Sequence, residues 1–265
     1  MRYIYIITLV ILASTTLGSA QFDHFDLSQS CMDEAQKLIG SEEINACVPI
    51  SSFASLISNS KSENEEAAMK TMADSICGLP KCSDSLVAST QKDFRAACQQ
   101  DLKAKNDLAN SIDAAIALYS PLRDSICFKN STDGYCFIES YTSLKQINDK
   151  APKNQSPVLT FAGASNEQVC TPCNKAITNT FNNYQKVHPE AFTAIQGYSD
   201  KDVETAKNAL TGKCGESFLD GQIGDTKQKP SEFQQQSSPN KSDASSLIAN
   251  GLSLATFVGS LIALI

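Results

Sequence analysis

The cysteines constrain this chain more than any other feature of its sequence. All ten lie between Cys31 and Cys214. An even number of cysteines in a chain that enters the secretory pathway predicts disulfides rather than free thiols or metal ligands. The predicted disulfide residues are Cys31, Cys47, Cys77, Cys82, Cys98, Cys127, Cys136, Cys170, Cys173 and Cys214. The fold must therefore bring these residues together in pairs.

The first twenty residues have the pattern of a secretory signal peptide. Arg2 precedes an apolar run over residues 3–13, and small residues lead to Ala20. A membrane-spanning helix needs about 20 apolar residues, so this run is too short to be one. The pattern predicts removal of residues 1–20 and a mature chain that begins at Gln21.

The cysteine spacing occurs twice along the chain. Two sets have 15 and then 28 or 29 residues between successive cysteines: Cys31, Cys47 and Cys77, then Cys82, Cys98 and Cys127. The third cysteine of each set ends the tetrapeptide Asp-Ser-Ile-Cys. This pattern predicts a duplicated unit, with repeats at 31–77 and 82–127.

Apolar residues recur at helical spacing through the cysteine-rich region. Helices are predicted around residues 35–39, 53–57, 69–76, 86–102, 108–119, 137–144, 177–184 and 199–210. Ser30 to Asp33 is predicted to cap the first, Pro121 to follow the fifth, and Gly212 to end the last. No window of similar strength alternates with period two. The predicted class is therefore all-α, a disulfide-stapled bundle of six to eight short helices.

Helix geometry restricts the disulfide pairing. A continuous helix from Cys82 to Cys98 would place the two about 24 Å apart at 1.5 Å per residue, whereas a disulfide needs Cα atoms within about 7 Å. These two cysteines are not expected to bond to each other. If each repeat is an antiparallel helical hairpin, Cys31 lies by Cys77 and Cys82 lies by Cys127.

Three motifs have a chemical interpretation as well as a structural one. Cys170-Thr-Pro-Cys173 has the spacing of a redox or zinc motif but lacks the context of either. His188 and Glu190 are not accompanied by a nucleophile signature. The acidic stretch 62–66 lacks the loop pattern of a calcium site. The sequence therefore predicts no catalytic residue, no metal ligand and no cofactor.

The sequence becomes polar and then apolar beyond the last cysteine. A helical ectodomain is predicted over residues 21–220 and a disordered polar stalk over 221–240. A polar spacer and an uncharged apolar tail follow, which is the pattern of a glycosylphosphatidylinositol (GPI) attachment signal. We expect attachment at Asn240, with Ser242 as the alternative, and removal of residues 241–265. A single-pass helix is the competing interpretation.

Two sequons in predicted loops, at Asn130 and Asn154, predict N-glycosylation. The net charge of −7 argues against a nucleic-acid partner, because phosphate binding needs a basic surface. The expected partners are the membrane, through the lipid anchor, and cell-wall polysaccharide or another surface protein.

Three segments carry a family resemblance: Leu118–Cys127, Gly134–Cys136 and Cys170–Ile177. They resemble fungal secreted cysteine-rich glycoproteins that often end in a GPI signal. The resemblance covers roughly residues 31–214 and rests on cysteine spacing. It implies a fungal cell-surface or cell-wall protein with a helical ectodomain, from a family without an established activity.

Together these features favour a non-enzymatic, GPI-anchored surface or wall glycoprotein with a structural or interaction role. The alternative is a carrier of a small apolar ligand, such as a lipid or sterol. Its cavity would be lined by Phe94, Ile116, Tyr119 and Tyr141. A hydrolase of wall polymers is a weaker alternative, because the chain has no tryptophan and no convincing pair of carboxylates.

Overall fold

Helices make up almost all of the regular structure in the described part of the chain. The computed structural model describes residues 27–49, 65–150, 164–195, 198–224 and 226–227. Within these residues there is no β-strand, and isolated bridges join Lys129 to Tyr135 and to Lys227. The predicted all-α class is confirmed. Contacts divide the described chain into two units, one up to Tyr119 and one from Ser120.

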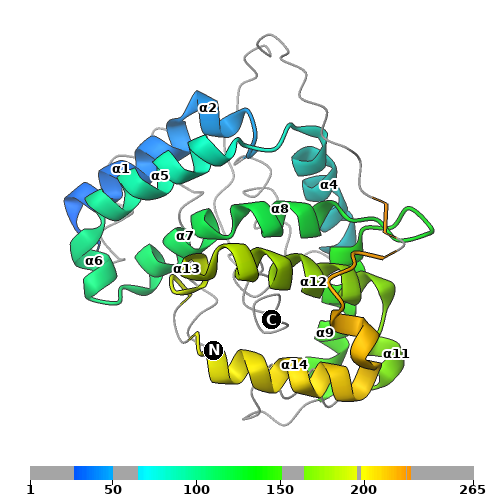
Figure 1. The fold of residues 1–265 in the computed structure, drawn as a ribbon. Helices are drawn as coiled ribbons and strands as arrows, with labels where there is room; N and C mark the ends of the chain where they lie inside the picture. The colour runs from blue at the N-terminus through cyan, green and yellow to red at the C-terminus, as the bar shows by residue number, and fades with distance from the viewer. Residues whose placement is uncertain (1–26, 50–64, 151–163, 196–197, 225, 228–265) are drawn as a thin grey trace. The chain divides into compact units, whose positions relative to one another are not determined.

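Figure 1 labels the helices in chain order. The first unit contains α1 (Gln29–Gly40), α2 (Glu42–Asn45), α4 (Glu65–Gly78), α5 (Asp84–Ala97), α6 (Gln99–Lys103) and α7 (Asp107–Ala117). α8 (Tyr119–Cys127) starts at the boundary. The second unit continues with α9 (Cys136–Lys150), α11 (Asn166–Val169), α12 (Pro172–Val187), α13 (Pro189–Phe192), α14 (Asp200–Cys214) and the 3₁₀ helix η4 (Glu216–Leu219). Eight of these described helices have nine or more residues, which agrees with the predicted number. None of them is long and apolar enough to span a membrane.

The first unit is built on the antiparallel pair α1 and α5, which lie side by side (Figure 1). Cys31 at the start of α1 bonds to Cys98 just after α5. Cys47 just after α2 bonds to Cys82 just before α5. The Cα–Cα distances are 4.4 and 5.1 Å, which is the ordinary range for a disulfide. The 15 residues between Cys31 and Cys47 thus run antiparallel to the 15 residues between Cys82 and Cys98, and a disulfide joins the two segments at each end.

The predicted pairing inside each repeat is wrong. Cys31 does not bond to Cys77, and Cys82 does not bond to Cys127, because α1 packs on α5 from the other predicted repeat. Each of these two disulfides joins a cysteine of the first predicted repeat to a cysteine of the second. The expectation that Cys82 and Cys98 do not bond to each other is confirmed, since α5 lies between them. The duplication itself stays a prediction.

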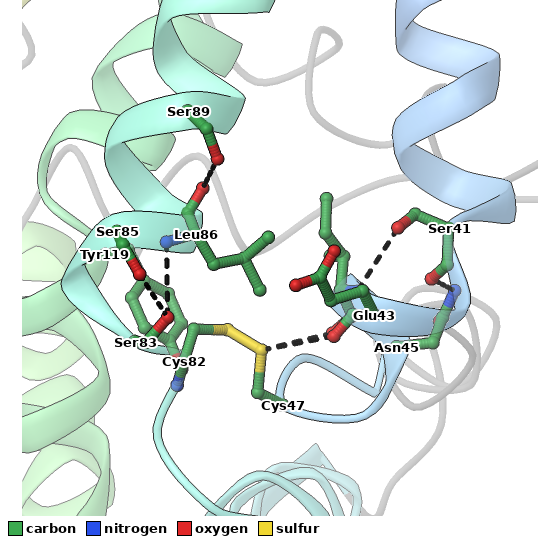
Figure 2. Close-up of a disulfide and its surroundings, with 11 residues drawn as sticks. Ser41, Glu43, Asn45, Cys47, Cys82, Ser83, Ser85, Leu86, Ser89 and Tyr119 are labelled. Carbon is green, nitrogen blue, oxygen red and sulfur yellow. Dashed lines mark hydrogen bonds between the residues drawn. A yellow bond between two sulfur atoms is a disulfide. The ribbon is translucent and has the colours of Figure 1, made fainter.

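Two serine N-caps lie beside the Cys47–Cys82 disulfide (Figure 2). The Ser41 hydroxyl accepts a hydrogen bond at 3.3 Å from a backbone N–H of α2. The Ser83 hydroxyl accepts one at 3.2 Å from a backbone N–H of α5. Such a cap satisfies an N–H that the helix leaves unpaired and contributes about 1 kcal/mol. The bridge thus joins two chain segments whose helices begin at capped residues.

A residue far along the chain caps α1. Asp101 is 5% exposed and accepts hydrogen bonds from the Ser28 N–H at 2.8 Å and the Ser28 hydroxyl at 2.6 Å. The predicted capping box at Ser30–Asp33 is wrong, because Ser28 is the N-cap and the Ser30 hydroxyl donates to the Ala97 carbonyl at 2.8 Å. A tertiary contact between residues 73 positions apart therefore replaces the local cap.

Phe94 lies in the hydrophobic core of the first unit. Its side chain is fully buried, and the buried residues that form this cluster with it are Leu27, Cys31, Met32, Cys98, Leu108 and Ala109. Next to Phe94, the Arg95 guanidinium donates two hydrogen bonds to Asp113 of α7, at 2.7 and 2.9 Å. Asp113 is 5% exposed, so loss of Arg95 would cost more than loss of an exposed ion pair. This contact fixes α5 against α7.

Two helix boundaries differ from prediction and one agrees with it. The helix predicted over 86–102 is interrupted at Cys98, which separates α5 from α6. α7 ends before Pro121 as predicted, and Pro121 lies in the first turn of α8, where the missing N–H has no intrahelical role. α14 continues past Gly212 and ends before Gly215, whose φ of +86° lies in the region that favours glycine. The helix predicted over 53–57 lies outside the described residues.

Candidate functional site

The Cys170-Thr-Pro-Cys173 motif is a structural junction. Cys173 bonds to Cys136 of α9, with Cα atoms 4.9 Å apart, and Cys170 bonds to Cys214 of α14, with Cα atoms 5.3 Å apart. A Cys-x-x-Cys redox centre bonds its two cysteines to each other, and here each has a different partner. The motif therefore links α12 to α9 and joins the turn before α12 to the end of α14.

Asn174 completes this junction from within α12. It is 1% exposed, and its amide oxygen accepts a hydrogen bond from the Ser140 hydroxyl at 2.6 Å. Its amide nitrogen donates to the backbone carbonyls of Gln168 and Val169, both at 3.0 Å. Because buried polar groups are costly when unpaired, this side chain holds three segments in one arrangement.

α12 also binds a segment that follows α14. We call the segment 215–227, described over 215–224 and 226–227, the strap. The fully buried Asn179 donates to the carbonyls of Phe218 at 2.9 Å and Gln222 at 3.0 Å, and accepts from the Gly221 N–H at 3.1 Å. One side chain thus satisfies three backbone groups of the strap.

Two more residues on the same face of α12 bind the strap, at four-residue spacing from Asn179. Asn183 donates to the Gly221 carbonyl at 2.8 Å. The Lys175 ammonium donates to Asp220 at 2.8 Å. This hydrogen bond, with one from a backbone N–H, lowers the pKa of the Asp220 carboxyl below its usual value. The strap is therefore held along α12 by backbone and side-chain contacts.

The end of the strap pairs with the loop after α8. The Lys227 N–H donates to the Lys129 carbonyl at 2.9 Å, and the Lys129 N–H donates to the Lys227 carbonyl at 3.0 Å. The Lys227 ammonium lies 3.1 Å from Asp133. Backbone hydrogen bonds therefore hold the end of the strap on the second unit at Lys227, which lies within the region 221–240 where composition predicts a disordered stalk. The boundary of the stalk stays a prediction.

The sequon at Asn130 lies in the same loop. Its side-chain oxygen accepts hydrogen bonds from the Thr132 hydroxyl and the Gly134 N–H, both at 2.9 Å, and its amide nitrogen donates to Glu139 at 3.1 Å. An amide nitrogen carries two hydrogens, so a glycan there would leave one for Glu139. Glycosylation at Asn130 stays a prediction. Asn154, Asn240 and Ser242 lie outside the described residues.

Tyr198 belongs to a polar chain between α12 and α14. Its hydroxyl accepts a hydrogen bond from Gln185 and donates one to Asp200 at 3.0 Å, while Lys207 donates to Gln185 at 3.0 Å. Burial, followed by the Asp200 carboxylate, raises the pKa of Tyr198 to about 12. Burial is also the largest cause of the lowered pKa of Lys207. The network connects two helices through polar groups of both charge signs.

We expect Tyr198 of the folded protein to ionise near pH 12. This ionisation should be absent from the titration of the Tyr198→Phe variant. The folded state holds this proton more tightly than the unfolded chain, whose tyrosines ionise near pH 10. The stabilisation is therefore complete below pH 10 and is lost as the pH rises toward 12. Absorbance titration of the phenolate measures the ionisation, and an identical curve for Tyr198→Phe would contradict the assignment.

The other sequence candidates do not assemble a reactive centre in the described residues. His188 lies 3.5 Å from Glu190 at the end of α12, with 46% and 70% of the two side chains exposed, and its ring centroid is 4.6 Å from that of Tyr184. No group of three His, Cys, Asp or Glu residues in this part of the chain is placed to hold a metal ion. Most of the acidic stretch 62–66 lies outside it.

The residues predicted to line a ligand cavity are divided between the two units. Phe94 lies in the first core, and Ile116 packs against it partly buried. The Tyr119 hydroxyl accepts a hydrogen bond from the Cys82 N–H at 3.0 Å. Tyr141 is a half-buried residue of α9 in the second unit.

The sequence interpretation missed the side chains of α12 that bind the strap. Asn179 and Asn183 lie inside a helix, although asparagine is a weak helix former because its side chain competes for backbone groups. Asparagines at i and i+4 in an amphipathic helix were the available signal. They indicate a helix face that binds backbone rather than solvent.

The fold and these contacts define a disulfide-linked, all-helical domain. All ten cysteines are disulfide-bonded, which fits an extracellular or secreted protein. The chain belongs to the family described as "Domain of unknown function (DUF7729)", which matches residues 18–223. The matched region reaches the part of the strap that Asn179 binds. No curated protein and no solved structure matches the chain.

Proposed function

We propose that this protein is a GPI-anchored glycoprotein on the outer face of the plasma membrane or in the wall of a fungal cell. Its domain has a structural or interaction role there rather than a catalytic one. The observation that carries the proposal is the complete oxidation of the ten cysteines, which an oxidising exterior maintains. The polar-to-apolar change in composition after residue 221 supports the lipid anchor.

The use of the buried polar side chains supports a scaffold role. Asp101, Asp113, Asn174 and Asn179 are all at most 5% exposed, and each binds another segment of the same chain. Catalytic groups in contrast direct polar atoms toward a substrate. These four residues hold the helices and the strap in position, which suits a domain that presents a stable surface to polysaccharide or to another protein.

Phosphatidylinositol-specific phospholipase is expected to release the protein from membranes of cells that express it. The released chain should end at Asn240 and lack residues 241–265, as measured by mass spectrometry of its C-terminal peptide. Replacing Asn240 and Ser242 together with bulky residues is the control, because attachment needs small residues. Mature protein that keeps residues 252–265 and resists the enzyme would instead support a single-pass helix.

A further inference from the structure

We propose that the strap is a releasable section of the tether. Its release would let the anchored domain extend farther from the membrane than it does with the strap bound. This inference rests on the proposed function, in which the lipid is attached at Asn240. The strap begins directly after Cys214, the last cysteine, and ends thirteen residues before Asn240. It is therefore the part of the domain through which any force from the anchor enters.

The bonds that hold the strap differ in kind from those that hold the domain. Cys214 is bonded to Cys170, so a chain that opens from its C-terminal side must stop there. Beyond Cys214 the described residues are held by hydrogen bonds, by ion pairs and by the packing of Phe218 and Leu219. Gly215, with φ +86° and no atom within 4 Å of a Cβ built on it, marks the junction. Opening of the strap therefore leaves every disulfide intact.

The strap contacts lie in an order that permits opening from one end. A pull on the chain after Lys227 acts first on its pairing with Lys129, next on the contacts of Gln222 and Gly221, and last on Phe218. Local units with few apolar contacts open at lower free energy than the whole domain. Phe218 is buried and Leu219 is partly buried in one apolar cluster. The described residues of the strap after Leu219 are held by hydrogen bonds and ion pairs, so this later part of the strap fits the description.

Release of the strap lengthens the chain available to the tether. The strap ends thirteen residues before the attachment site in sequence, and its release adds the thirteen residues 215–227. An extended chain spans at most about 3.3–3.6 Å per residue, so release adds at most roughly 45 Å of reach. A surface domain gains access to more distant partners without unfolding.

Hydrogen exchange of the purified full chain, with disulfides intact, tests this inference. The Lys129 N–H belongs to the body of the unit and donates to the Lys227 carbonyl, so its exchange rate reports opening of the end of the strap. Asn183→Ala removes one hydrogen bond to Gly221 and is expected to speed exchange of the Gly221 N–H, which donates to Asn179, roughly 3- to 10-fold. Exchange at Lys129 and Lys227 should change less, because this pair opens before the Gly221 contact. Amides of α14 should change less than about 2-fold, because the opening stops at Cys214.

Thr180→Ala is the matched control on the same helix. Its hydroxyl donates to the Ala176 carbonyl within α12 at 2.8 Å, so exchange at Gly221 should be unchanged. Asn183 is used because it is less buried than Asn179, whose loss would disturb the core. Equal acceleration of α14 and the strap, or an unprotected Lys129 in the natural protein, would overturn the inference. Neither outcome depends on a lipid at Asn240, which the phospholipase experiment tests separately.

Discussion

Replacing Cys31 and Cys98 together with alanine is expected to lower the free energy of unfolding of the first unit by about 4 kcal/mol. The bridge joins residues 67 positions apart, and a loop of this length gives about that value in the chain-entropy description of a disulfide. Both residues are also fully buried beside Phe94. For a unit of roughly 90 residues the melting temperature should fall by roughly 16–32 °C.

The matched comparison is the double replacement of Cys47 and Cys82. That bridge joins residues 35 positions apart, so its removal should cost about 0.5 kcal/mol less. Thermal unfolding followed by circular dichroism measures both variants. A melting temperature that does not change would contradict the role of the first bridge. Non-reducing peptide mapping that joins Cys31 to Cys77 would contradict its connectivity.

Phe94→Ala is expected to destabilise the first unit by about 3–5 kcal/mol. The side chain is fully buried against the Cys31–Cys98 disulfide and Leu108, so truncation loses apolar burial and leaves a cavity. Phe94→Leu retains most of the volume and should cost less than about 1.5 kcal/mol. Denaturant unfolding of the three proteins measures these differences.

The stability of Phe94→Ala also shows whether Phe94 lies in a packed core or lines a ligand cavity. Val187 is 70% exposed, and Val187→Ala should change stability by less than about 0.5 kcal/mol, which controls for loss of apolar atoms as such. If Phe94 lined a cavity for a lipid or sterol, its truncation would enlarge a space that already exists and would cost little. A loss below about 1 kcal/mol would therefore favour the carrier alternative.

The secondary structure of this chain was largely predictable because its signals are local. Apolar spacing located α5, α7, α12 and α14, since a helix repeats every 3.6 residues whatever it packs against. The same rise per residue excluded a bond between Cys82 and Cys98. Cysteine number and the signal pattern predicted complete oxidation, since both are properties of composition and compartment rather than of packing.

Pairing and boundaries depended on contacts between residues far apart in the sequence. Cys31 bonds to Cys98 because α1 packs on α5, and no local pattern distinguishes that partner from Cys77. The cap of α1 comes from Asp101, and the predicted local box does not form.

Residues 221–240 have few apolar side chains, and composition alone predicts a stalk there. The helix face of Asn179 and Asn183 binds the backbone of Gly221 and Gln222 at the start of this region. The sequence determined what is helical and oxidised, because those properties arise within a few turns of chain or from residue type. The tertiary structure decided which helix meets which, and where the domain ends, because hydrogen bonds to the backbone carry no apolar signature in the segment that they hold.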